Sequence, residues 1–114
     1  MPGGTAPPLH AHHHEAELMY LIEGEVSFRC GEEQRACQAG AFVYLPRGIP
    51  HAFKVESSQA RLLGLVVPGG LEKFYEAVGE PATELRLPEA PPDVVRWLEL
   101  SHRYGIEVVG PPLL

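Results

Sequence analysis

The chain has 114 residues, of which 45% are apolar, and its formal net charge is −6 at pH 7. This size suits one domain with a modest hydrophobic core, so we expect residues 1–114 to form a single domain. The negative charge and the lack of a Lys/Arg cluster argue against nucleic acid as a partner, which favours a small molecule. No stretch is long and apolar enough to span a bilayer and the start does not resemble a secretory leader, so we expect a cytoplasmic protein without a membrane partner.

The first 67 residues predict an all-β barrel or sandwich. Short runs rich in Val, Phe, Tyr, Leu and Ile alternate with Gly, Pro and Glu clusters, which is typical of such folds. The predicted strands cover residues 9–12, 17–23, 25–30, 35–38, 41–45, 51–56 and 61–67. Residues 31–34 predict a hairpin turn, because Gly31 can adopt a positive φ, and residues 46–50 predict a tight loop, because Pro fixes φ there and Gly relieves it.

Residues 68–114 predict a tail with two short helices. A helix is expected over residues 71–78, because its apolar residues are three, four and seven apart. A second helix is expected to begin after Asp93 and to end at Gly105. Its apolar stripe would comprise Val94, Trp97, Leu98 and Tyr104. We expect the helices to pack on the outside of the barrel.

Histidines provide the strongest chemical signal. Five of the six lie in or beside two strand-turn-strand units: His10, His12, His13, His14 and His51. On a strand, residues two apart face the same side, so His10 and His12 point together while His13 points away. Two imidazoles can then bind one ion, and residues that begin neighbouring strands could complete its ligand set.

Two spacing patterns resemble the two motifs of the cupin family. The first is Gly4, five residues, His10-Ala11-His12, four residues, Glu17, six residues and Gly24. The second is Gly40, five residues, Pro46-Arg47-Gly48, two residues and His51, with Val55 where the family usually has Asn. The resemblance implies a double-stranded β-helix, or jelly-roll, barrel. It also implies one divalent metal ion (Fe, Mn, Ni, Zn or Cu) bound by His10, His12, Glu17 and His51.

Other residues near these ligands have less specific roles. Three apolar residues share side-chain parity with Glu17 or His51 and could line a substrate pocket or belong to the core: Met19, Leu21 and Phe53. We expect His13 and His14 at a turn or rim, with His14 as a possible substitute ligand. Glu15 is expected in solvent, and Trp97 in the core.

Only nine residues precede His10. Fully extended, they span about 30 Å, enough for at most one strand. Since the family usually has further strands there, the barrel would have an unpaired edge, and proteins normally cover such edges. We therefore expect a homodimer in which a second copy covers this edge.

Three functions remain open from the sequence. Residues 68–75 and 104–112 are similar to small bacterial cupins described as quercetinase-like. That resemblance favours a metal-dependent dioxygenase acting on an aromatic or diketone-like molecule, with Glu17 also acting as a catalytic base. The alternatives are a metal-assisted isomerase or lyase, and a non-catalytic module that binds a small molecule, because one fold hosts many chemistries.

Overall fold

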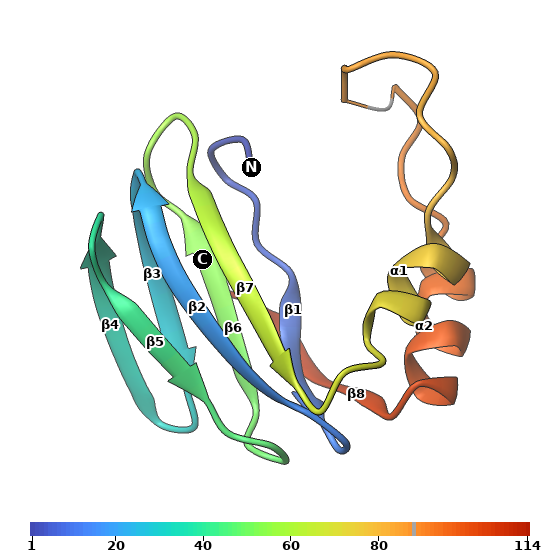
Figure 1. Ribbon diagram of the computed structural model, residues 1–114, viewed down its shortest axis with the longest axis horizontal. Coiled ribbons are helices and arrows are strands. Elements are labelled where there is room, and N and C mark those ends of the chain that lie inside the picture. Colours follow the sequence, from blue (N-terminus) through green and yellow to red (C-terminus); the bar gives the residue numbers. More distant parts are fainter. Residues whose placement is uncertain (88) are drawn as a thin grey trace.

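Eight strands and two helices occur in the part of the chain that the computed structural model describes, residues 1–87 and 89–114 (Figure 1). In chain order they are β1 (Pro8–His12), β2 (Ala16–Glu23), β3 (Glu25–Cys30), β4 (Glu33–Gln38), β5 (Phe42–Leu45), β6 (His51–Val55), β7 (Arg61–Val67), α1 (Glu72–Val78), α2 (Val94–Arg103) and β8 (Ile106–Pro112). All seven strands predicted from the sequence are found, and so are both helices.

The strands form two antiparallel sheets that face each other as the walls of a barrel (Figure 1). One sheet has the order β4-β3-β6-β1-β8, and the other has the order β5-β2-β7. Residues along each strand alternate between the inside and the outside: on β2, Leu21 is fully buried while its neighbours Tyr20 and Ile22 are exposed. The structure confirms the predicted all-β barrel of the jelly-roll type with two short helices.

One end of the barrel is filled by an apolar core. Leu21, Val26, Phe28, Val55 and Ala60 form this cluster between the two sheets. Burying each larger side chain contributes roughly 1.5–3 kcal/mol relative to leaving it exposed. Val55 occupies the position at which the second motif usually has Asn. Because Val55 is only 1% exposed and packs in this cluster, an apolar residue suits that position here.

The turn between β2 and β3 depends on Gly24, the last residue of the first motif. Its φ of +97° lies in the left-handed region that favours glycine. A Cβ atom at this position would lie 2.5 Å from the backbone oxygen of Gln59. Gly24 is therefore required both by the turn and by the close approach of the chain that leads into β7.

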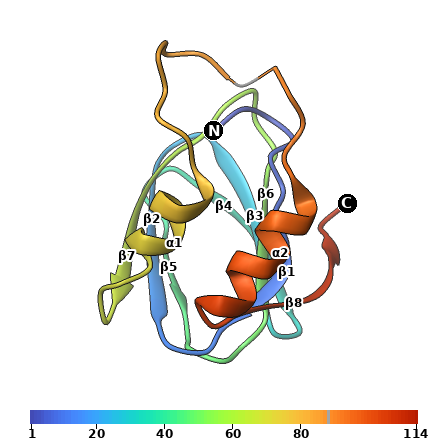
Figure 2. The same cartoon turned by 90° about the vertical axis from the view of Figure 1, so that its right-hand side faces the viewer.

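The two helices lie across the open side of the barrel and not on its outer wall, which corrects the sequence prediction (Figure 2). They are held there by a second apolar cluster that joins both helices to β8: Leu71, Phe74, Leu100 and Ile106. Asp93 caps α2 as predicted, since its carboxylate accepts a hydrogen bond from the backbone N–H of Arg96 at 3.1 Å. No helix of the described residues is long and apolar enough to cross a membrane.

The tail also contains a strand that the sequence did not predict. β8 pairs antiparallel with β1, from Pro8 opposite Pro112 to His12 opposite Ile106. The chain's own C-terminal segment thus covers the edge of β1 that was expected to be unpaired. The Gly and Pro residues of β8 obscured the strand pattern, but Pro is tolerated there because β8 lies at the edge of its sheet. The reason for expecting a homodimer over the edge of β1 is therefore removed.

Candidate metal centre

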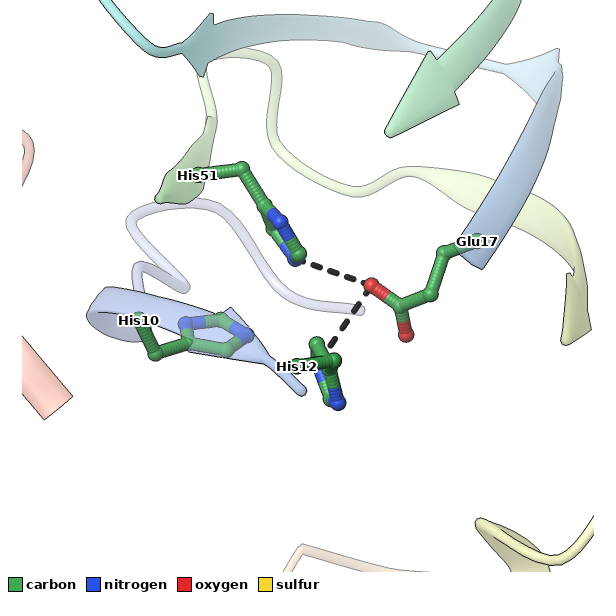
Figure 3. Close-up of side chains that lie close together, drawn as sticks. All are labelled: His10, His12, Glu17 and His51. Atoms are coloured by element: carbon green, nitrogen blue, oxygen red, sulfur yellow. Dashed lines mark ion pairs between the residues drawn. The ribbon is translucent and has the colours of Figure 1, made fainter. Parts of the chain in front are cut away.

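Three strands bring the four proposed ligands to one point between the sheets (Figure 3). His10 and His12 lie on β1, His51 begins β6, and Glu17 lies on β2 of the opposite sheet. His10 is the register partner of His51, which places the two imidazoles side by side across β1 and β6. One nitrogen or oxygen atom from each of the four side chains lies within 4.8 Å of those of the other three.

The Glu17 carboxylate is the centre of the contacts within this cluster. Its Oε2 atom lies 2.9 Å from Nε2 of His51 and 3.5 Å from Nε2 of His12. The His10 ring packs edge-on against the rings of both other histidines, at centroid distances of 4.6 Å and 5.0 Å. His12, Glu17 and His51 are buried, while His10 is half-buried. The cluster is therefore largely withdrawn from water.

His10 is oriented by the backbone of its own strand. Its Nδ1 atom lies 2.6 Å from the carbonyl oxygen of Pro8, which can only accept a hydrogen bond. The proton of the neutral ring is therefore on Nδ1, which leaves the lone pair of Nε2 free to bind a cation. A backbone carbonyl that fixes the ring in this way is a common second partner of metal-binding histidines.

The environment favours the protonation states that a metal ion requires. Burial lowers the pKa of His10 below its ordinary value and lowers that of His12 to about 4, so both rings are neutral at pH 7. Burial alone would raise the pKa of Glu17, but the nearby imidazoles of His51, His12 and His10 outweigh it and lower the pKa. Neutral imidazoles and an ionised carboxylate are the forms that bind divalent metals.

The geometry of the four side chains fits one divalent ion. Ligand atoms bound to one ion at about 2.1 Å lie no more than about 4.2 Å apart, so side-chain shifts of less than about 1 Å would suffice here. Nε2 of His51, the ring nitrogen that faces Glu17, is among the buried polar atoms without a hydrogen-bond partner in the described part of the chain. Leaving such polar groups buried and unpaired is costly, and metal binding would offset part of that cost. The cluster could therefore hold a metal ion.

Glu15 is a residue of this region that the sequence prediction placed wrongly. It was expected in solvent, but it is only 7% exposed, and its Oε2 atom lies 3.9 Å from Nδ1 of His12. Burial raises the pKa of its carboxyl group. Glu15 precedes β2 in an irregular turn, where strand parity gives no information about side-chain direction, so no sequence signal identified it.

The other two histidines of the first motif region lie outside the cluster. The exposed His13 ring pairs with Glu107 of β8, with Nε2 and Oε2 2.8 Å apart. His14 is exposed, and its ring lies against Gly105, where a Cβ atom would collide with it. Both residues thus lie at the rim, as expected, and His14 is not among the residues that converge on Glu17.

A cavity of about 650 Å³ opens from the cluster toward the two helices. Met19 and Phe53 line it together with the cluster residues. Leu21 does not line it, which corrects the prediction, because Leu21 is 1% exposed and packs in the core at the other end of the barrel. The opposite wall, which the sequence analysis missed, comes mainly from the helices: Phe74, Tyr75, Val94, Trp97, Leu98 and Ser101.

Comparisons with known proteins identify a family and several similar proteins. Residues 1–68 match the family model described as a cupin domain. Two curated proteins named quercetin 2,3-dioxygenase are similar to the chain. The one from Bacillus subtilis (strain 168) is 26% identical over 72 residues, which cover 63% of this chain and 21% of the relative. The one from Aspergillus japonicus is 28% identical over 86 residues, which cover 71% of this chain and 24% of the relative.

A solved structure of comparable size is also similar. The TT1209 protein from Thermus thermophilus has 35% sequence identity and a TM-score of 0.56, over 60% of this chain and 66% of that one. The present chain spans only about a fifth to a quarter of the length of the two curated dioxygenases. The family model, in contrast, covers more than half of the chain, including all four residues of the cluster. The chain therefore belongs to the cupin family.

Proposed function

We propose that the protein is a metal-dependent dioxygenase that acts on a small, largely apolar molecule of the aromatic or diketone type. The observation that carries this proposal is the chemical contrast within the cavity. The His10, His12, Glu17 and His51 cluster lies at one end, while most of the remaining lining is aliphatic or aromatic. A substrate that fits has one oxygen-bearing end for the metal and an apolar body for the rest of the cavity.

The lining also argues against strongly anionic substrates. Among the described residues that line the cavity there is neither Lys nor Arg. A sugar phosphate or a dicarboxylate would place charged oxygens in this apolar space without a cationic side chain to pair with them, which is costly. The lack of Lys and Arg among the described lining residues therefore favours a largely apolar substrate over a sugar phosphate or a dicarboxylate.

Each residue of the cluster has a role in the proposal. His10, His12 and His51 would bind the ion through neutral imidazoles, and Glu17 would add a negative charge. A redox-active ion held there supplies coordination positions for a substrate oxygen and for dioxygen. Glu17, whose pKa is lowered and which is therefore ionised at neutral pH, would accept the proton of an enolic or phenolic substrate hydroxyl on its carboxylate.

The wall formed by the helices would exclude water from the reacting groups. Phe74 and Trp97 meet edge to face with ring centroids 6.3 Å apart, and both line the cavity opposite the cluster. An aromatic wall of this kind can stack on a flat apolar substrate and orient its oxygen-bearing end toward the cluster. The two dioxygenases to which the chain is similar support the same reaction class.

The test is oxygen uptake by protein loaded in turn with Fe, Mn, Ni, Zn or Cu, with flavonols, catechols and 1,3-diketones as substrates. We expect uptake with at least one redox-active metal, and its loss in Glu17→Gln. Glu107→Gln, which changes a carboxylate at the rim, serves as the matched control and should retain activity. Turnover without oxygen would favour the isomerase or lyase alternative. Tight binding without turnover would favour a binding module, and either result would contradict the proposal.

A further inference from the structure

Ser101 on α2 is a buried polar residue outside the metal centre. Five polar residues are buried in the described part of the chain, and four of them lie in or beside the cluster: His12, Glu15, Glu17 and His51. Ser101 is the fifth, with 6% of its surface exposed, and it belongs to the wall that the helices form. Serine is mostly an exposed residue, so a polar group in this apolar wall requires an explanation.

The side chain of Ser101 faces the cavity. Val94, Trp97, Leu98 and Ser101 line the cavity, and the last three follow Val94 by three, four and seven residues, which places all four on one face of α2. Along this face the exposed fraction falls from 60% at Val94 to 44% at Trp97 and 6% at Ser101. The face therefore runs from the open part of the cavity to its closed end, where Ser101 lies.

The closed end of the cavity is joined to the strand that carries two of the proposed ligands. α2 ends at Arg103 and packs against β8, which begins three residues later at Ile106. Ile106 is the register partner of His12 on β1, and both residues line the cavity together with Ser101. A molecule bound at the cluster can therefore reach the Ser101 side chain.

The Ser101 hydroxyl has no hydrogen-bond partner among the described residues. A serine in a helix often bonds to the carbonyl oxygen four residues earlier, here that of Trp97, but the described chain lacks this bond. The other two hydroxyl groups that line the cavity differ from it. That of Thr5 donates to the carbonyl oxygen of Pro2 at 2.7 Å, and Tyr75 is 59% exposed. Leaving a buried hydroxyl unpaired is costly, and an oxygen atom of a bound molecule would supply the partner.

We propose that the Ser101 hydroxyl binds a second oxygen atom of the substrate, next to the oxygen that the metal ion binds. This contact rests on the proposed function, because the substrate must first be held at the cluster. The hydroxyl can donate to a carbonyl or phenolate oxygen and can accept from a hydroxyl group. The substrate class is thereby narrowed to molecules with two neighbouring oxygen atoms at one end of an apolar body, such as catechols and enolised 1,3-diketones.

The contact at Ser101 fixes both the orientation and the choice of substrate. A molecule held at one oxygen can still rotate about that contact, and a second contact removes this freedom. A molecule with a single oxygen leaves the buried hydroxyl unpaired, and sites built to bond a polar group discriminate strongly against an analogue that lacks it. Ser101 is therefore a specificity-determining residue that touches the substrate and does not bind the metal ion.

The test compares two flat ligands, 2,3-dihydroxynaphthalene and 2-naphthol, which differ only in the second oxygen. Their dissociation constants are measured by calorimetry on protein loaded with Zn²⁺, which has no redox chemistry, so neither ligand is consumed. We expect Ser101→Ala to weaken binding of 2,3-dihydroxynaphthalene about 3- to 10-fold, as for the loss of one hydrogen bond, and that of 2-naphthol less than about 2-fold. Ser58→Ala, the same substitution at an exposed serine between β6 and β7, should leave both constants unchanged.

The ratio of the two dissociation constants decides the outcome. An unchanged ratio in Ser101→Ala would overturn the proposal, because the second oxygen would then be bound by the ion or by water. The proposed function would survive that result. Binding of neither ligand to the wild type would contradict both the proposed function and the contact at Ser101.

A second measurement needs no ligand. Since the Ser101 hydroxyl has no partner in the described chain, metal-free Ser101→Ala should unfold in urea at the same midpoint as the wild type or at a higher one. A clearly lower midpoint would show that the hydroxyl is bonded within the protein, and that result would also overturn the proposal.

Discussion

Replacing His12 by Gln should make folding of the metal-free protein less sensitive to acid. His12 is 4% exposed, and burial lowers its pKa from the ordinary 6.5 to about 4. Between these two values the unfolded chain carries a proton on His12 that the folded chain does not. The state that binds more protons is stabilised as the pH falls, and here that is the unfolded state. The free energy of unfolding therefore decreases as the pH falls from 6.5 toward 4.

The magnitude follows from the width of this pH interval. A difference of one bound proton changes the free energy of unfolding by about 1.4 kcal/mol per pH unit. From pH 6.5 to pH 5, the contribution of His12 is therefore a loss of about 2 kcal/mol. Gln cannot take up a proton, and its amide can still donate a hydrogen bond to Glu17, so we expect His12→Gln to fold at pH 7.

The assay is urea unfolding followed by circular dichroism at pH 7 and pH 5, in the presence of a chelator. Between these pH values the wild type should lose about 2 kcal/mol more than His12→Gln. His102→Gln, which removes an exposed histidine on α2, is the matched control and should behave as the wild type does. An equal loss in the wild type and in His12→Gln would refute the reasoning.

Three further predictions concern turns, metal affinity and the helices. Gly24→Ala should lower the free energy of unfolding by about 2–4 kcal/mol in urea titrations, because of its positive φ and the nearby backbone. Gly48→Ala, with a φ of +79° but open space around it, should cost only about 1 kcal/mol, and equal effects would contradict this. Glu15→Gln should weaken metal binding about 10-fold in calorimetry, because it removes a buried carboxylate that lies 3.9 Å from Nδ1 of His12, and unchanged affinity would remove that role. Leu71→Ala should cost about 2–4 kcal/mol in thermal or urea unfolding, since Leu71 is 1% exposed and joins the helices to β8; a loss below about 1 kcal/mol would count against it.

Strand periodicity explains why much of the site was predictable. The alternation along β1 is enough to place His10 and His12 on one side, and the motif spacing indicated Glu17 and His51. The direction of each side chain follows from its own strand, so local sequence carries that information. That the four side chains meet depends on which strands pair, and the family resemblance supplied this part of the prediction.

The missed features depend on contacts between distant parts of the chain. The pairing of β8 with β1 joins segments about 100 residues apart, and a Gly-Pro-Pro sequence within β8 hid the strand from local rules. The helical stripe containing Trp97 was recognised, but its partner was not, because a periodic pattern shows which face is apolar and not what covers it. Trp97, which lines the cavity, was therefore predicted in the core.

The most direct test of the metal centre is elemental analysis of two samples of the protein. One is purified without added metal, and the other is loaded with metal ions and then freed of the excess. We predict about one divalent ion per chain in the wild type. We predict little or none in His51→Ala and Glu17→Ala, with folding confirmed by circular dichroism, and an unchanged ratio in His102→Ala. A wild type that retains no ion after loading, or an ion that remains bound in His51→Ala and Glu17→Ala, would contradict the assignment of these residues as ligands.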